Sequence, residues 1–276
     1  MPLPHFLCIG AQKAGTTWLF ERLNEHPGAW LPPIKELHFF DHLFVPRNRE
    51  WTLWHIQTSV RRAIDWHVKN NPKPDLDYIR YLALLATDDV FSERWFRSAF
   101  DRPGARNRIC GDVTPEYSTV PEAGIHYLRG LLGAVKIIYI IRDPVRRALS
   151  QVRMQAMRQH GGEVDEATWL QLADHPDISN RGAYSEYVPR WKRAFAAEDL
   201  LFVPYRRIAE DPLAVMRDME ALLGLAPHEY GGIDRKVHAT APLKVPDAVH
   251  AVFHERYSGE AAFVEQEFGS AFAALT

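Results

Sequence analysis

The chain has 276 residues, of which 46% are hydrophobic and 25% charged, and its formal net charge is −2 at pH 7. This length lies near the upper limit for one hydrophobic core, so we expect a single domain over 1–276 with a helical insertion at about 42–100. The balanced charge argues against a general nucleic-acid binder, because such proteins carry a basic excess.

Short apolar runs alternate with helical patterns along the chain. Runs that are apolar on both faces predict buried parallel strands at 6–11, 108–113, 135–141 and 200–205, with a weaker candidate at 29–32. The predicted helices lie at 16–26, 144–160, 184–197 and 211–225. This alternation predicts an α/β fold, P-loop-like with three layers, in which a mostly parallel sheet is flanked by helices. Ligands of such folds bind beyond the carboxyl ends of the strands.

The segment at about 42–100 differs in composition from the rest of the chain. Aromatic side chains are spread over its amphipathic stretches, at Trp51, Trp54, Trp66, Tyr78, Tyr81, Trp95 and Phe96. We expect a helical insertion over one edge of the sheet whose aromatic residues mainly form a core. An insertion beside a site also commonly forms a lid.

The first strand leads into "GAQKAGTTW", residues 10–18, which nearly matches the nucleotide-binding loop G-x-x-x-x-G-K-[ST]. The lysine is displaced, because Lys13 lies inside the loop and Thr16 stands where that lysine belongs. A glycine loop that opens a helix binds phosphate through backbone N–H groups and the helix dipole. The alternative is a glycine turn with a threonine cap and a solvated lysine. Since no strand-end acid suits Mg²⁺, a donor that needs no metal fits better.

The strongest predicted strand ends at Arg142, and Ser150 lies two turns into the helix that follows. An arginine and a serine placed in this way can converge on one phosphate. Alternatively, Arg142 pairs with Asp143 or Asp112 and Ser150 is solvated. Two anion sites at the ends of two strands indicate a nucleotide with separated phosphate groups. The histidines show no H-E-x-x-H motif, so we expect no metal site.

These motifs together resemble the PAPS-dependent sulfotransferases, in particular the branch with the heparan sulfate N- and 3-O-sulfotransferases and their bacterial relatives. "GAQKAGTTWL" is similar to the family's 5′-phosphosulfate loop, and "YIIRDPVRRALSQ" to its 3′-phosphate motif. "KELHFFD", residues 35–41, resembles the acidic segment after the first helix, and "GDVTPEYS", residues 111–118, resembles the segment EK-S/T-P-x-Y.

The resemblance implies PAPS as sulfonyl donor, PAP as product and no metal. It implies that Lys13 contacts the sulfonate and the bridging oxygen. The residues implied around the 5′-phosphate are Ala14, Gly15, Thr16, Thr17 and Trp18, and those at the 3′-phosphate are Arg142 and Ser150. Glu36 aligns with the family's catalytic base, with His38 and Asp41 near the acceptor. His38 is the competing base or an orienting partner of Glu36.

Two features depart from this branch. Val113 replaces a lysine of the EK-S/T-P segment, and the family's C-terminal K-G-R loop, which closes over the donor, has no clear counterpart in 235–247. Arg235, Lys236 and Lys244 are the candidate replacements. Both departures argue against a heparan-like acceptor more than they argue against sulfonyl transfer.

The sequence therefore predicts a sulfotransferase that transfers the sulfonyl group of PAPS to a hydroxyl or amine of a glycan, lipid or small metabolite by in-line displacement. The rivals are a P-loop nucleotide kinase or NTPase and a catalytically silent nucleotide-binding protein; ATP has no 3′-phosphate for Arg142 and Ser150. Cys8 and Cys110 predict buried thiols and, without a visible signal peptide or membrane span, a cytoplasmic protein. A homodimer is compatible with the sequence but is not required by it.

Overall fold

The computed structural model describes residues 3–87, 89–233 and 243–276. At its centre is a five-stranded parallel sheet with the strand order β2-β3-β1-β4-β5. The strands are β1 Phe6–Gly10, β2 Ala29–Trp30, β3 Ile109–Val113, β4 Lys136–Ile141 and β5 Leu200–Pro204. All five predicted strands are therefore confirmed, including the weak candidate, which forms the short edge strand β2.

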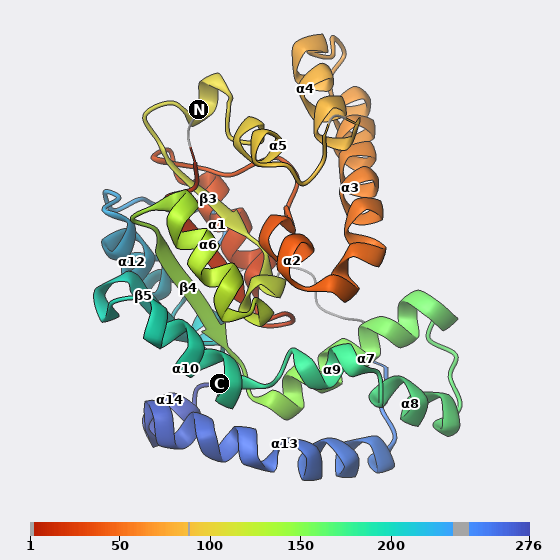
Figure 1. The fold of residues 1–276 in the computed structure, drawn as a ribbon. Helices are drawn as coiled ribbons and strands as arrows, with labels where there is room; N and C mark the ends of the chain where they lie inside the picture. The colour runs from red at the N-terminus through yellow and green to blue at the C-terminus, as the bar shows by residue number, and fades with distance from the viewer. Residues whose placement is uncertain (1–2, 88, 234–242) are drawn as a thin grey trace.

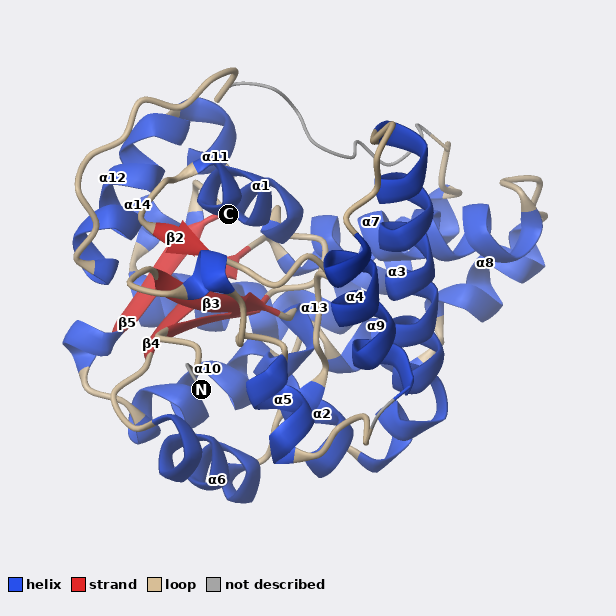
Figure 2. Cartoon of the chain, turned by 90° about the horizontal axis from the view of Figure 1, so that it is seen from above, coloured by secondary structure: helices blue, strands red, loops and turns tan. Residues whose placement is uncertain are grey.

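Helices cover both faces of the sheet, with α1 and α12 on one side and α6 and α10 on the other (Figure 2). The helices of this sheet region are α1 Thr16–Glu25, α2 Phe39–Phe44, α6 Glu122–Leu132, α7 Pro144–His160, α10 Tyr184–Ala194, α11 Arg207–Glu210, α12 Pro212–Leu223 and α14 Ser270–Ala273. The predicted α/β fold with a central parallel sheet is confirmed.

Both ends of α12 carry residues typical of helix caps. The Asp211 side chain accepts a hydrogen bond from the Ala214 amide at 3.1 Å, and Gly224 follows the helix with φ +65°. The strands are apolar on both faces because both faces are covered: every residue of β1 is buried.

Further helices lie beside the sheet region (Figure 1). They are α3 Arg49–Asn70, α4 Leu76–Thr87, α5 Glu93–Ser98, α8 Glu166–Ala173, α9 Pro176–Asn180 and α13 Asp247–Phe268. Single 3₁₀ turns are η1 Pro46–Asn48, η2 Pro103–Ala105, η3 Pro115–Thr119 and η4 Ala197–Asp199. None of the helices in the described residues is long and apolar enough to cross a membrane.

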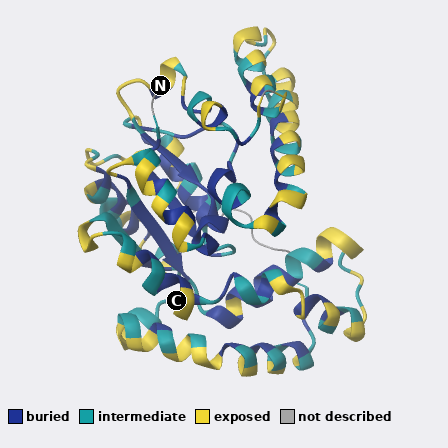
Figure 3. Ribbon diagram, viewed as in Figure 1, coloured by how far each residue is buried: buried dark blue, intermediate teal, exposed yellow. Residues whose placement is uncertain are grey.

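The predicted helical insertion contains α3, α4 and α5, and the hairpin of α3 and α4 projects away from the sheet (Figure 1). Its aromatic residues do not share one role. Trp95 and Phe96 are buried in the main core, as expected, but Trp54 and Trp66 are each 66% exposed. A two-helix hairpin buries only the faces that meet, so the outer face of α3 remains exposed, as the exposed residues of Figure 3 show.

Cys8 and Cys110 are free, buried thiols, as predicted. Burial raises the pKa of the Cys8 thiol to about 12, so it is an inert core side chain.

Candidate active site

The loop between β1 and α1 has the geometry of a phosphate-binding turn. Gly15 occupies the N-cap of α1 with φ +84°, and a Cβ there would lie 3.0 Å from Ile208 Cδ1 and 3.3 Å from a ring carbon of Tyr205. The position therefore requires glycine. The cap contributes no side-chain acceptor and the first turn has no acidic residue. The first amides of α1 and the positive end of its dipole are thus available to an anion.

Lys13 lies inside this loop, as the sequence indicated, with φ +69°. Its Nζ is 3.8 Å from Met154 Sδ on α7. Burial lowers the pKa of the Lys13 ammonium to about 8, and Arg158 and Arg142 contribute through charge repulsion. The local field is positive, which is what an anion site requires.

Arg142 brings the second predicted anion motif against the loop. Its Nη1 donates a hydrogen bond to the Lys13 carbonyl at 2.5 Å, and its guanidinium lies 4.4 Å from the centre of the Tyr205 ring. Its Nε is buried and has no hydrogen-bond partner among the described residues. Asp143 caps α7 by accepting from the Arg146 amide at 2.7 Å, so the structure does not show the alternative pairing with Arg142. Ser150 is largely buried in α7.

The remaining predicted donor residues surround the loop. Ala14 is fully buried, Thr16 and Trp18 are nearly so, and Thr17 is half-buried. The Trp18 indole N–H donates to the Ile233 carbonyl at 3.1 Å, so the segment after α12 lies against α1. Arg235 and Lys236, two candidates for the donor-closing loop, lie outside the described residues.

Lys244, the third candidate for the donor-closing loop, is exposed. Val113 is 1% exposed in β3, so this position contributes core packing and no charge to the site.

Asp112, the acidic residue next to Val113 in β3, accepts hydrogen bonds from the Tyr117 hydroxyl at 2.7 Å and the Thr114 hydroxyl at 2.9 Å. Burial raises its pKa to about 6. Asp112 is thus engaged in its own network and does not pair with Arg142.

Glu36 and His38 lie in the segment between β2 and α2, and both have a left-handed backbone, with φ +67° and +53°. Together with Lys13 they are three of the six non-glycine residues with positive φ in the described part of the chain. Such conformations are unfavourable and cluster at functional sites. The three residues predicted to be catalytic thus share a backbone feature that the sequence did not reveal.

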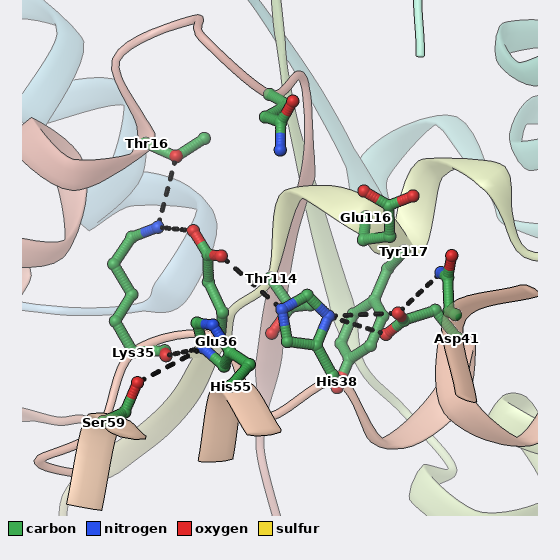
Figure 4. Close-up of polar contacts among 12 residues, drawn as sticks. Thr16, Lys35, Glu36, His38, Asp41, His55, Ser59, Thr114, Glu116 and Tyr117 are labelled. Carbon is green, nitrogen blue, oxygen red and sulfur yellow. Dashed lines mark hydrogen bonds and ion pairs between the residues drawn. The ribbon is translucent and has the colours of Figure 1, made fainter. Parts of the chain in front are cut away.

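A continuous chain of polar contacts joins this segment to the phosphate loop (Figure 4). Lys35 Nζ is 3.5 Å from Thr16 Oγ1 and forms an ion pair with Glu36. The other Glu36 oxygen is 3.5 Å from His38 Nε2, and His38 Nδ1 is 3.0 Å from Asp41 Oδ2. The base candidates are therefore placed directly beside the donor loop.

These contacts set the charges of the two base candidates. Burial favours a neutral Glu36, but Lys35 and His38 outweigh it and hold the pKa of that carboxyl well below its usual range. Burial also opposes the imidazolium of His38, yet Asp41 and Glu36 raise its pKa to about 10. At neutral pH the pair consists of a carboxylate and an imidazolium, so Glu36 is the member able to accept a proton.

His55 of α3 is a site residue that the sequence analysis did not identify. Its Nε2 is 3.2 Å from the Lys35 carbonyl, and its ring centre is 4.7 Å from that of His38. Ligand-type atoms of Glu36, His38 and His55 lie within 4.8 Å of one another. A metal ion there would have to displace the Lys35 ammonium and the His38 proton, so the arrangement is better suited to an ion-pair network.

Arg181 is a second residue that the sequence analysis missed. It forms a buried ion pair with Glu116 of η3 at 2.7 Å, and its Nη1 donates to the Gln12 side chain at 3.2 Å. Asp177 of α9 is 3.4 Å from the same guanidinium. The pair therefore joins the phosphate loop, η3 and α9. No local pattern indicates this pair, because Arg181 and Glu116 are separated by 65 positions along the chain.

The fold and site define a P-loop-like α/β protein with cationic groups at two strand ends, an arrangement typical of phosphate binding. Residues 4–229 match the sequence pattern of the sulfotransferase family, and the chain belongs to this family.

Its similarity to characterised relatives is distant but extensive. It is 26% identical over 237 residues to the bifunctional heparan sulfate N-deacetylase/N-sulfotransferase 4 of Mus musculus, covering 82% of this chain and 23% of that protein. It is 24% identical over 234 residues to the mouse heparan sulfate glucosamine 3-O-sulfotransferase 5, covering 82% of this chain and 54% of that protein. The chain therefore spans about a quarter to a half of these relatives' lengths.

Solved structures confirm the fold. The sulfotransferase from Alicyclobacillus acidocaldarius superposes with a TM-score of 0.65 at 21% identity, covering 99% of both chains. The sulfotransferase domain of the Synechococcus PCC 7002 olefin synthase gives a TM-score of 0.54 at 18% identity, covering 93% of this chain and 88% of that one.

Proposed function

We propose that the protein transfers the sulfonyl group of PAPS to a hydroxyl or amine of an acceptor and releases PAP. The observation that carries this proposal is the contact of Arg142 with the Lys13 carbonyl. It places a second cationic group beside the phosphate loop, which suits a donor with a 3′-phosphate as well as a 5′-phosphosulfate. The cytoplasmic location, the single domain and the homodimer stay predictions.

In this proposal the amides of α1, with Ala14, Gly15, Thr16, Thr17 and Trp18, surround the 5′-phosphate. Arg142 and Ser150 bind the 3′-phosphate, and the buried, unpartnered Arg142 Nε supports this role because a phosphate oxygen would satisfy it.

The transfer is an in-line displacement at sulfur. The acceptor oxygen or nitrogen forms a bond to sulfur while the bond from sulfur to the bridging oxygen breaks. Glu36 accepts the acceptor's proton, and the Lys13 ammonium offsets the charge that develops on the leaving phosphate. His38, held by Asp41, fixes the orientation of Glu36. These residues act through positioning and charge, and the reaction requires no metal.

The experiment compares binding of 3′,5′-ADP and 5′-ADP in EDTA by calorimetry and thermal unfolding. We expect 3′,5′-ADP to bind at least tenfold more tightly, and Arg142→Ala to remove most of that difference, since a hydrogen bond to a charged group contributes about 2 kcal/mol. Arg193→Ala, at an exposed ion pair with Glu122, is the matched control. Equal binding of the two nucleotides, or a strict Mg²⁺ requirement, would contradict the proposal.

To identify the acceptor, transfer of the label from labelled PAPS is measured for glycans, lipids, phenols and small metabolites. The relatives are named for heparan sulfate, so N- and O-linked positions of that glycan belong in the first set. Glu36→Gln should abolish transfer to any acceptor that is found. Undiminished transfer by this variant would show that Glu36 is not the base.

A further inference from the structure

Lys35 has two partners that belong to different halves of the site. Its ammonium is 3.5 Å from the Thr16 hydroxyl, at the start of α1, and it also forms the ion pair with Glu36 (Figure 4). Its side chain is 18% exposed and that of Glu36 is 27% exposed, so both are only partly hydrated. Its backbone is held in place, because the Lys35 carbonyl lies 3.2 Å from His55 Nε2.

In this arrangement Glu36 is a poor base. One carboxylate oxygen is occupied by Lys35, and the other lies 3.5 Å from His38 Nε2. Both contacts stabilise the ionised form and keep its pKa well below the range in which a general base is effective. For Glu36 to accept a proton, at least one of these contacts has to weaken.

Lys35 is the partner that can move. His38 is 1% exposed and is fixed from behind by Asp41, whereas lysine carries its charge on a flexible four-carbon stem. An anion at the amino end of α1 would lie next to Thr16 and would compete with Glu36 for the ammonium. The charged and titratable groups that act on Glu36 include Lys35 and His38 from its own segment and His55 from α3. Lys13 of the phosphate loop and Arg181 also act on it.

We propose that Lys35 is a donor-sensing positioning residue: it leaves Glu36 for the anionic 5′ group of the bound donor, and so releases Glu36 as base only when the donor is present. This inference rests on the proposed function, because it requires a donor with an anionic group at the loop. It predicts that the donor binds before the proton of the acceptor is removed.

The test is a double-mutant cycle on the binding of 3′,5′-ADP, which cannot react and carries the 5′-phosphate. Affinities are measured by calorimetry for the wild type, Lys35→Met, Glu36→Gln and the double variant. In the presence of Lys35, Glu36→Gln should tighten binding by about fivefold or more, since no ion pair has to be broken. In the Lys35→Met background the same change should alter affinity less than twofold, and Lys35→Arg should restore the larger effect.

Thermal unfolding of each variant establishes that it is folded, and Lys35→Gln replaces Lys35→Met if the latter is not. An equal effect of Glu36→Gln in both backgrounds would overturn the role of Lys35, while the preference for 3′,5′-ADP over 5′-ADP would leave the proposed function intact. If the wild type shows no such preference, the proposed function is wrong and the donor-sensing role falls with it.

Discussion

The charge on His38 is the property of this site that can be tested most directly, by the substitution Asp41→Asn. His38 and Asp41 are 1% and 0% exposed, and His38 Nδ1 lies 3.0 and 3.2 Å from the two carboxylate oxygens. Asn48 Nδ2 donates to the same carboxylate at 2.9 Å. Asparagine at position 41 keeps the shape and removes the charge, so His38 should lose its proton near neutral pH.

The magnitude follows from the raised pKa of His38, about 10, against the ordinary value of about 6.5. Because the folded pKa lies above the unfolded one, the stabilisation is fully present below pH ~6.5 and is lost as pH rises through ~10. A rise of the pKa from about 6.5 to about 10 corresponds to about 4 kcal/mol at pH 7. Because Glu36 supplies part of this rise, we expect Asp41→Asn to cost about 3 kcal/mol at that pH. In a chain of this size, that corresponds to a fall in Tm of about 6 °C or more.

The assay is urea unfolding of the wild type and Asp41→Asn between pH 6 and pH 10. The difference in free energy of unfolding should be largest at pH 6–7 and should shrink steadily toward pH 10. A residual difference that does not change with pH belongs to the hydrogen bond from Asn48. Asp211→Asn is the matched control, because Asp211 caps α12 and has no histidine partner.

A constant difference across the whole pH range would refute the reasoning. It would mean that His38 is neutral in the folded protein, and His38 would then become a competitor of Glu36 for the role of base. Nitrogen NMR of the imidazole separates the two states independently, since the imidazolium and the neutral ring have different shifts. Other titratable groups also face His38, namely Glu36, His55 and Asp112. They must be the same in the wild type and in Asp41→Asn.

Three further predictions concern the donor loop and its support. Gly15→Ala should cost about 1–2 kcal/mol in thermal unfolding, because φ is +84° there, whereas Gly130→Ala in α6 meets nothing within 4 Å and should stabilise the helix slightly. Arg181→Met should cost about 3 kcal/mol or more in urea unfolding by leaving Glu116 buried and unpaired, and adding Glu116→Gln should recover part of the loss. Since the pKa of Lys13 is about 8, calorimetry should show that affinity for 3′,5′-ADP falls between pH 7 and 9, and Lys13→Met should flatten this dependence.

The placement of Lys13 and Arg142 at one edge of the sheet was predictable because it depends on short-range patterns. A run that is apolar on both faces and is followed by a glycine loop specifies a buried strand and the turn after it. This local signal does not depend on the rest of the chain. Parallel strands then bring their carboxyl ends to one edge, which is why Lys13 and Arg142 meet although the sequence separates them by 129 positions.

The acceptor side was only partly predictable, because its geometry depends on how distant segments pack. Glu36 and His38 were identified from a motif, but no pattern indicated that His55 of α3 would contact the Lys35 carbonyl. The charge state of His38 was equally hidden, since it results from two carboxylates that lie close enough to outweigh the effect of burial. The exposure of Trp54 and Trp66 was missed because amphipathic spacing does not tell which face of a hairpin finds a partner.

The charges of the site explain how a chain with a net charge of −2 can build an anion site. Lys13, Lys35 and Arg142 come from three separate segments, and the fold brings them to one edge of the sheet. Of these, Lys35 is neutralised by Glu36, while Arg142 contacts a carbonyl and a tyrosine ring. An arriving anion therefore finds two cations available at once and a third that becomes available when it leaves Glu36. In the proposed mechanism, local convergence, and not overall composition, supplies both donor binding and the control of the base.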